Sequence, residues 1–251
     1  MSFYYIDGFD NYSFSTNQNR VQAINSPSLT SAAQRFGSGY GLRMPRSDNG
    51  VSRQFGGTKS EGIIAFALRW DSRANTISPL TIWDGSSLQM GFNIDVSNDI
   101  VLYRSGATLQ TAVAAFPSTP GWHFLEFRWK IANSISAGDC AVRVNGVTLL
   151  EATAGHDTQA TGNAYGTLFR IFGFGNATGQ TIDVDDLYCM DSTTFIGERR
   201  VISFMPMGNG NYSQLTNSAS NRTDNYTYVD ETIPDGDTSY VQSPNTGDKD
   251  S

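Results

Sequence analysis

Short runs of alternating apolar and polar residues recur along most of this 251-residue chain, with turn-forming residues between them. In residues 61–72 and 121–131 successive side chains alternate between two faces, which is the period of a β-strand. No stretch longer than about twelve residues keeps a helical period free of Gly, Pro and Asn. The pattern therefore predicts an all-β fold, an antiparallel two-sheet sandwich of the jelly-roll type.

The clearest strand, residues 121–131, has two unlike faces. One face carries apolar residues and a histidine: His123, Leu125, Phe127, Trp129 and Ile131. The other begins with aromatic residues and ends with charged ones: Trp122, Phe124, Glu126, Arg128 and Lys130. We expect this strand to be central where it begins and to have one side in water where it ends. Glu126, Arg128 and Arg143 are expected to pair across strands.

Several turns can be predicted from local residue types. Asn145-Gly146 is the strongest hairpin signal in the chain, and Asp84-Gly85 is expected to form the turn of a second hairpin. Ile182 and Val184 share one face of the last strong strand, whereas Leu187 and Cys189 fall out of phase. A β-bulge at Asp185-Asp186 would return both to the core face. Residues 108–116 are compatible with a strand or a short helix, and residues 31–36 with a helical turn.

The composition changes after about residue 200. Residues 207–251 are rich in Asn, Ser, Thr, Asp, Gly and Tyr and contain too little apolar surface for a core of their own. We predict a sandwich over residues 1–200 and an extended polar arm over 201–251. The arm is expected to contact a partner through Tyr212, Tyr226, Tyr228 and Tyr240. A mobile tail is the alternative.

Charge and hydropathy exclude several classes of protein. The net charge is −7 and the pI is about 4.7, whereas a nucleic-acid-binding protein usually has a basic patch. The only compact basic groups are Arg43 with Arg46 and Arg199 with Arg200. The N-terminus lacks the features of a signal peptide, and no window approaches the ~20 apolar residues of a membrane span. The sequence thus predicts a protein made in a cytoplasm that binds neither nucleic acid nor membrane.

The two cysteines, Cys140 and Cys189, both fall in predicted strands. Two cysteines form neither a disulfide framework nor a zinc site by themselves. We expect two buried thiols that pack as small hydrophobic groups. A disulfide bridge between facing strands is the alternative in an oxidising environment.

Catalytic patterns are weak in this sequence. Hydrolysis by a nucleophile needs a histidine base, and the chain offers only His123, which alternates with core residues, and His156, in a loop. Asp183 and Asp185 have the alternate spacing that places two carboxylates on one face of a strand, as glycoside hydrolysis requires. No Glu-x-Asp-x-x-Glu pattern surrounds them. The sequence therefore predicts a protein that is not an enzyme.

Two groups of aspartates make calcium the one cofactor that the sequence leaves as an alternative. Asp183, Asp185 and Asp186 could bind calcium, as could the loop residues Asp95, Asp99 and Asp157. Acidic residues in bulges and loops are more often turn formers, and no other cofactor motif is present. We therefore predict no cofactor, with calcium at Asp183, Asp185 and Asp186 as the open alternative.

Two motifs carry a resemblance to a known superfamily. The hairpin "WHFLEFRWK…GDCAVRVNGV" and the strand "IDVDDLYCMD" resemble the concanavalin A-like lectin/glucanase superfamily in its laminin G-like jelly-roll form. This resemblance covers roughly residues 1–195. It implies a sandwich with loops and a concave sheet suited to sugar rings, and we take Trp83, Asp84, Tyr103 and His156 as candidate carbohydrate-binding residues.

A second resemblance covers the remainder. "FIGERRVISFMPMGNGNYSQLT" and "DGDTSYV", together with the opening "IDGFDNY", are similar to a family of virion proteins of tailed bacteriophages. The resemblance implies a structural protein of the virion, assembled in the host cytoplasm and associated with the tail, baseplate or fibre. Its implied partners are other virion proteins, further copies of itself and a host surface polysaccharide. The alternatives are a capsid decoration protein and a carbohydrate-active enzyme.

Overall fold

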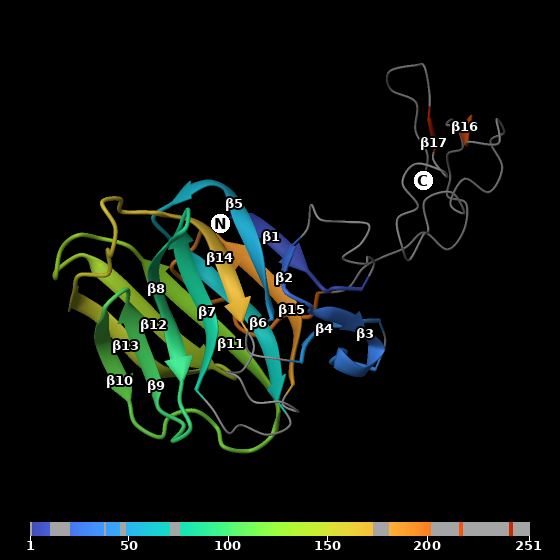
Figure 1. Cartoon of the computed structure of the whole chain (residues 1–251), viewed down its shortest axis with the longest axis horizontal. Coiled ribbons are helices and arrows are strands. Elements are labelled where there is room, and N and C mark those ends of the chain that lie inside the picture. The colour runs from blue at the N-terminus through green and yellow to red at the C-terminus, as the bar shows by residue number, and fades with distance from the viewer. Residues whose placement is uncertain are drawn as a thin grey trace. The chain divides into compact units, whose positions relative to one another are not determined.

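The structure is a computed structural model, and it describes residues 2–10, 21–37, 39–45, 49–70, 76–172, 181–201, 216–217 and 241–242. Nearly all of the regular structure in these residues is β-strand. A single 3₁₀ turn, η1 (Ser31–Ala33), is the only helical element among them, and it agrees with the helical turn expected near residue 31. Two antiparallel sheets pack face to face, which confirms the predicted sandwich (Figure 1). No helix in the described residues could span a membrane.

The eight-stranded sheet contains the strands that the sequence pattern marks most clearly. In spatial order its strands are β13 (Val147–His156), β12 (Gly138–Val144), β11 (Gly121–Lys130), β6 (Glu61–Trp70), β15 (Ile182–Met190), β4 (Gly41–Met44) and β3 (Ser28–Thr30), and β1 (Phe3–Asp7) also pairs with β15. The central strand β6 pairs with β11 on one side and with β15 on the other. Strands far apart in sequence are thus neighbours in this sheet.

The seven-stranded sheet lies in front of the first in Figure 1. In spatial order its strands are β10 (Ala107–Ala112), β9 (Ile100–Arg104), β8 (Ser87–Ile94), β7 (Ile77–Asp84), β14 (Gly166–Phe172), β5 (Gly50–Lys59) and β2 (Gln22–Ile24). Residues 107–112 form a strand, so the short helix considered for this stretch is not present. Strand β14 inserts between β7 and β5, which joins the two halves of the sheet.

The described residues fall into two units. The sandwich lies within residues 1–9 and 19–201. The second unit is drawn from residues 10–18 and 202–251, and within it strands β16 (Thr216–Asn217) and β17 (Val241–Gln242) form an antiparallel pair. The four arm tyrosines lie outside the described residues. The extended arm and the domain boundary near residue 200 therefore stay predictions.

The core between the sheets follows the predicted alternation. On β6 the inward residues are Ile64, Phe66, Leu68 and Trp70, and on β11 they are His123, Leu125, Phe127 and Trp129. Trp129 is fully buried and stacks on Phe55 of the opposite sheet at 5.6 Å between ring centroids. Aromatic stacking of this kind adds to the free energy gained by burying apolar area. The two sheets are thus joined by an aromatic inner layer.

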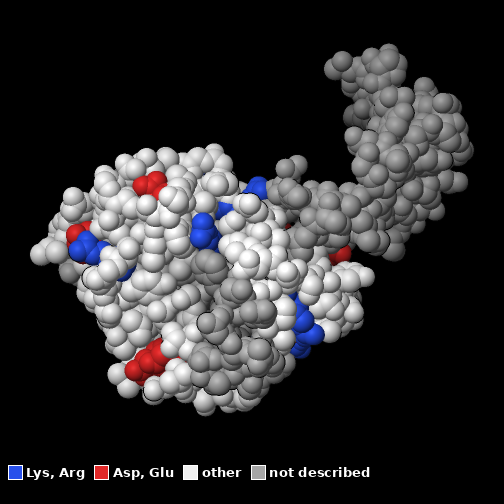
Figure 2. Space-filling model, in the orientation of Figure 1, with Lys and Arg blue, Asp and Glu red and all other residues white. Residues whose placement is uncertain are grey.

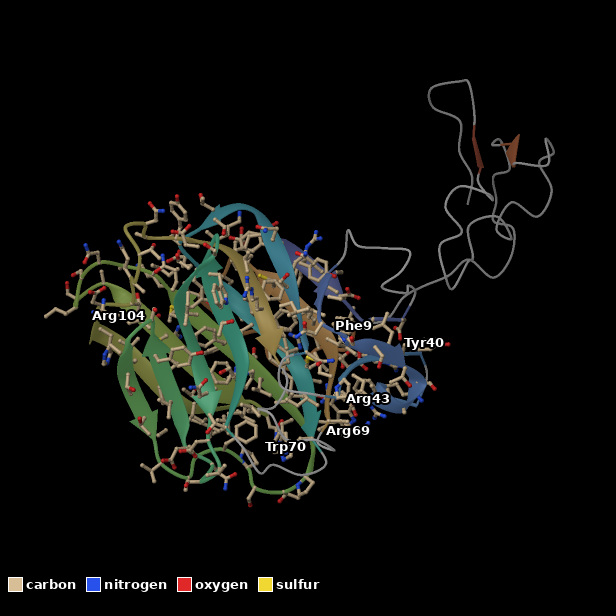
Figure 3. The ribbon with its side chains drawn as sticks, viewed as in Figure 1. Phe9, Tyr40, Arg43, Arg69, Trp70 and Arg104 are labelled. Carbon is tan, nitrogen blue, oxygen red and sulfur yellow. The ribbon has the colours of Figure 1, made fainter. Side chains whose placement is uncertain are left out.

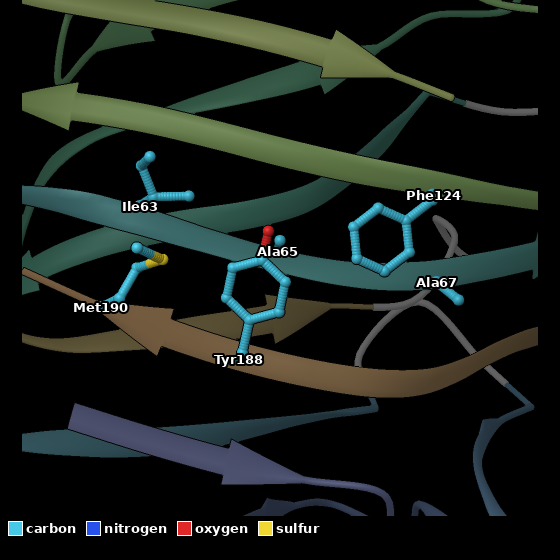
Figure 4. Packing of buried hydrophobic residues seen from close by; sticks show 6 residues of the cluster. All are labelled: Ile63, Ala65, Ala67, Phe124, Tyr188 and Met190. Atoms are coloured by element: carbon cyan, nitrogen blue, oxygen red, sulfur yellow. The ribbon is translucent and has the colours of Figure 1, made fainter. Parts of the chain in front are cut away.

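Part of the outer face of the eight-stranded sheet is also buried. A second apolar cluster lies there, comprising Ile63, Ala65, Ala67, Phe124, Tyr188 and Met190 (Figure 4). Residues 192–201, which we call the covering segment, lie over it and pack Phe195 and Ile196 against it. The covering segment also contacts β15 and the residues after η1: the Val201 amide donates to Asp186 at 2.7 Å, and Glu198 pairs with Arg35.

Glu126 lies beneath the covering segment and not in water, so the expected wet side of β11 is wrong at this position. Its side chain is 1% exposed and accepts hydrogen bonds from the Tyr188 hydroxyl at 3.1 Å and from the Gly197 amide at 2.8 Å. Arg143 lies 3.6 Å away, which confirms the expected cross-strand pair. Arg128 pairs instead with Asp139 and Glu151. Burial, followed by the adjacent Glu126 carboxylate, raises the pKa of Tyr188, so its phenol remains a hydrogen-bond donor.

Local turn chemistry is confirmed at two positions and corrected at a third. Asn145 and Gly146 form the two-residue turn between β12 and β13, both with positive φ (49° and 83°). The bulge at Asp185-Asp186 is present, with Asp186 at a φ of 54° and a register shift between Asp185 and Tyr188. In the β7–β8 hairpin Asp84 pairs with Ser87, so the turn is formed by Gly85 and Ser86 and not by Asp84 and Gly85.

The two thiols are free and buried, as expected. Cys140 lies on β12 and Cys189 on β15, with β11 and β6 between them. Three strand spacings separate them by about 14 Å, roughly twice the Cα separation that a disulfide allows. A bridge between these two cysteines within one chain is therefore excluded.

Both thiols should resist alkylation in the folded protein. Burial raises the pKa of Cys140 to about 12 and raises that of Cys189 further above its usual range. Since the thiolate is the reactive form, we expect neither cysteine to react with iodoacetamide at pH 8, and both to react once denaturant is added. Mass spectrometry of the treated protein measures this. Rapid modification of Cys189 in the native protein would contradict the buried position of β15.

Candidate functional site

The outer face of the seven-stranded sheet carries a continuous row of polar and aromatic residues. Strand pairing places six residues side by side across six strands: Tyr103, Gly91, Thr81, Arg170, Ser52 and Gln22. The residues on either side of this row along the strands, such as Ile82, Phe92 and Phe169, are fully buried in the inner core, so the row faces outward. Five strand spacings give it a length of about 24 Å.

Trp83 extends this row toward the end of the sheet. It lies two residues after Thr81 on β7, on the same face, and pairs with Leu168 of β14 and Leu88 of β8. Its indole Nε1 donates to the Thr81 hydroxyl at 2.8 Å, and the Arg170 guanidinium lies 3.9 Å from the ring centroid. These contacts hold the indole in one position while it remains partly exposed. A fixed aromatic surface of this kind requires little ordering when a flat ligand binds.

Tyr103 lies at the other end of the row. Its phenol forms a hydrogen bond with Ser78 of β7, so the side chain crosses β8. The residue paired with it on β8 is Gly91, which has no side chain to block this path. Burial raises the pKa of Tyr103 above its usual range, although the Ser78 hydrogen bond acts in the opposite direction. The phenol therefore stays neutral at physiological pH and can donate a hydrogen bond.

Charged side chains are few on this side of the molecule (Figure 2). The strands of the seven-stranded sheet contain four cationic residues, Arg53, Lys59, Arg104 and Arg170, and one acidic residue, Asp84. Their net charge is +3, within a chain whose net charge is −7. Of the charged groups, Arg170 stands in the outward row itself. Figure 3 shows Arg104 at the margin of the sandwich, where it pairs with Asp157.

Asp84, predicted beside Trp83, supports a loop at the end of the sheet. Its Oδ2 accepts hydrogen bonds from the Thr161 hydroxyl and the Asn163 amide, both at 2.9 Å. The fully buried Gln89 holds the same loop: its amide donates to the carbonyls of Asn163 and Tyr165, and its carbonyl accepts from the Ala160 amide. Both residues thus fix the loop of residues 159–165.

The two histidines do not join the outward row. His156 ends β13 in the other sheet, where its backbone pairs with Gly138. His123 is packed in the core, as expected, and stacks on Trp70 at 4.9 Å between ring centroids. Its Nε2 lies 3.0 Å from the Thr119 carbonyl oxygen and its Nδ1 lies 3.1 Å from the Asn145 amide. Of the four candidate carbohydrate-binding residues, the structure brings Trp83 and Tyr103 to one face and places Asp84 and His156 elsewhere.

The aspartates considered as calcium ligands are each engaged by arginines or backbone amides. Asp183, 1% exposed, accepts hydrogen bonds from both Arg43 and Arg69, at 2.7 Å and 3.1 Å from their Nε atoms. Asp185 accepts from the Arg35 amide, and Asp186 pairs with the Arg35 guanidinium. Burial raises the pKa of Asp186, against the effects of the Val201 amide and Arg35. A cation here would have to displace these partners.

Among the described residues, no group of three His, Cys, Asp or Glu side chains is arranged to hold a metal. The three loop aspartates have other roles. Asp95 accepts from the amides of Ser97 and Asp99, the Asp99 carboxylate accepts from the Ala114 amide, and Asp157 pairs with Arg104. Calcium binding by the chain stays a prediction.

Arg170, Thr81 and Gly91 were not predicted as site residues. Alternation in residues 165–175 places Arg170 on the face opposite Phe169 and Ile171, which is a usable signal for an outward cation. Its position beside Thr81 depends on β14 lying next to β7, strands that are more than 80 residues apart. Local patterns contain no information on that neighbour.

No protein-family model matches the chain, and no match was found among curated proteins. Solved structures with a similar fold include a botulinum neurotoxin type C structure (12% identity, TM-score 0.46, covering 72% of this chain and 47% of that one) and a botulinum neurotoxin DC binding domain (11%, 0.45, 67% and 42%). Another is a Trypanosoma rangeli sialidase (14%, 0.44, 59% and 25%). The matches span less than half of those chains. At such identities and TM-scores the likeness supports no conclusion about ligand or activity. The described fold is that of a two-sheet β-sandwich.

Proposed function

We propose that the protein is a non-enzymatic carbohydrate-binding β-sandwich, and that the outer face of its seven-stranded sheet binds the glycan. The observation that carries this proposal is the outward row from Tyr103 to Gln22 with Trp83 beside it. Sugar rings present both flat apolar faces and hydroxyl groups, so they suit an aromatic surface flanked by neutral hydrogen-bonding groups. Trp83 supplies the flat surface, and Tyr103 and Gln22 supply the polar groups.

We choose the outer face of the seven-stranded sheet because the apolar cluster on the outer face of the other sheet is already covered. The outer face of the eight-stranded sheet has its apolar cluster under the covering segment, whereas Trp83, Tyr103 and Arg170 are partly exposed and Gln22 is exposed. A ligand at the first face would have to displace Phe195 and Ile196. At the second face Trp83, Tyr103, Arg170 and Gln22 are accessible, and Thr81 and Ser52 between them are buried. The outward row is therefore the better supported binding surface.

Replacing Trp83 with alanine should weaken glycan binding about tenfold or more, because it removes the fixed aromatic surface. The matched control is Trp122→Ala. Trp122 is also a partly exposed tryptophan with an arginine over its ring, Arg69 at 4.9 Å, but it lies on the other sheet. Affinity electrophoresis or calorimetry with a polysaccharide selected from a glycan array measures the change. Equal losses from both substitutions would contradict a site on the seven-stranded sheet.

The absence of catalysis is part of the same proposal. His123 is held by its core contacts, and the Asp183 carboxylate is paired with two arginines, so neither is placed as a general acid or base. We expect no reducing sugar to be released from a bound polysaccharide. Release that is lost in an Asp183→Asn variant of unchanged fold would contradict the proposal and favour a carbohydrate-active enzyme.

We also propose a place in the virion of a tailed phage, in the tail, baseplate or fibre. This rests on the resemblance of the motifs after residue 195 and of the opening residues. A glycan-binding face would have a use there in contacting the host surface. Immunogold electron microscopy of particles tests the location. Label on the head would favour a capsid decoration protein instead.

A further inference from the structure

Arg170 differs from six other arginines of the sandwich in having no acidic partner among the described residues. Six arginines form ion pairs with carboxylates: Arg35, Arg43, Arg69, Arg104, Arg128 and Arg143. Within the described part of the chain, Arg170 forms none, and its Nε is buried without a hydrogen-bond partner. Its guanidinium contacts the ring of Trp83.

The position of Arg170 makes this lack of a partner informative. The guanidinium carbon lies 3.9 Å from the centroid of the partly exposed Trp83 ring, and Arg170 stands in the middle of the outward row. Its neighbours across the strands are Thr81 and Ser52, which are neutral. A cation without an acidic partner, on a surface whose other groups are neutral, favours an anion from outside the chain. The cation–π contact also orients the guanidinium plane, which lowers the ordering cost of forming two hydrogen bonds to one acceptor.

The chemistry of the row indicates what kind of anion it would be. A carboxylate is planar and accepts two parallel N–H donors from one guanidinium. The rest of the row offers an aromatic ring and neutral hydroxyl and amide groups, which suit a sugar. Taking the proposed carbohydrate-binding function as its basis, we infer that the ligand is an acidic polysaccharide, and that Arg170 on the Trp83 ring binds the carboxylate of one of its sugar residues.

A panel of polysaccharides tests this with the full-length protein. The carboxylated probes are alginate, polygalacturonate, hyaluronan and polysialic acid, the sulfated probe is heparin, and the neutral probes are dextran and mannan. We expect binding to at least one carboxylated probe. The form of that probe with its carboxyl groups chemically reduced to alcohols should bind about tenfold or more weakly, and added salt should weaken binding of the native form.

Two substitutions of Arg170 test whether this residue binds the carboxylate. Arg170→Lys keeps the charge and loses the planar fork, so we expect a loss of about tenfold for the carboxylated probe; Arg170→Gln should lose more. Arg199→Gln is the control, since it removes the same charge from an exposed arginine of the covering segment. Thermal unfolding of each variant confirms that the fold is intact.

The outcomes separate this inference from the function on which it rests. Binding to neutral probes that Trp83→Ala abolishes and Arg170→Gln leaves unchanged would overturn the acidic ligand and keep the carbohydrate-binding face. Binding to heparin alone would overturn the carboxylate. Failure to bind any probe or any glycan on an array would overturn both proposals.

Discussion

Glu126→Ala should lower the free energy of unfolding by about 3–5 kcal/mol, because it removes a buried carboxylate that accepts two hydrogen bonds and faces an arginine. The substitution leaves the Gly197 amide without its acceptor, removes one acceptor of the Tyr188 hydroxyl and leaves Arg143 unpaired. It also opens a cavity under the covering segment. Because the Tyr188 hydroxyl is out of water, solvation offsets little of its loss.

Glu151→Ala is the matched control. Glu151 also pairs with an arginine, Arg128, but it is exposed, and exposed pairs contribute about 0–1 kcal/mol. Urea denaturation of both variants measures the difference. If Glu126→Ala and Glu151→Ala cost the same, the outer face of the eight-stranded sheet is not buried and the covering segment does not lie on it.

Trp129→Ala should have an effect of similar size, about 3–5 kcal/mol, at the inner face of the same sheet. The side chain is fully buried and stacks on Phe55 of the opposite sheet, so alanine would leave a large cavity between the sheets. Trp129→Phe should cost less, because it keeps a ring in the stack and removes an indole N–H that has no hydrogen-bond partner.

The same denaturation experiment checks this order. The urea concentration at the unfolding midpoint of Trp129→Phe should lie between those of the wild type and Trp129→Ala. A Trp129→Ala variant as stable as the wild type would mean that the two sheets do not pack through this residue. Together the two sets of variants test whether β11 is buried both toward the inner core and under the covering segment.

Much of this fold could be predicted because its signals are local. Alternation alone assigned the inward faces of β6 and β11, and the phase change between Val184 and Leu187 located the bulge. Asn145-Gly146 suits a two-residue turn because both positions adopt positive φ. The turn predicted at Asp84-Gly85 lies one residue later. Gly85 takes its first position and Ser86 its second.

The errors arose where contacts join distant parts of the chain. Glu126 follows an alternation that normally indicates a solvent-exposed face, and it is buried because Phe195, Ile196 and Gly197 lie over it, about 70 residues later. The candidate site also depends on contacts between distant strands that local patterns do not predict. Trp83 and Tyr103 were selected as aromatic residues, but their neighbours on the row depend on the order of strands in the sheet.

The central claim is that a glycan binds the outer face of the seven-stranded sheet. The chain has four tryptophans, so a ¹⁵N–¹H spectrum should resolve four indole signals, and a Trp83→Phe variant assigns the one of interest. Titration with an oligosaccharide from the polysaccharide that binds should shift the Trp83 signal and leave those of Trp122 and the buried Trp129 in place. A shift at Trp122 with none at Trp83 would contradict the account.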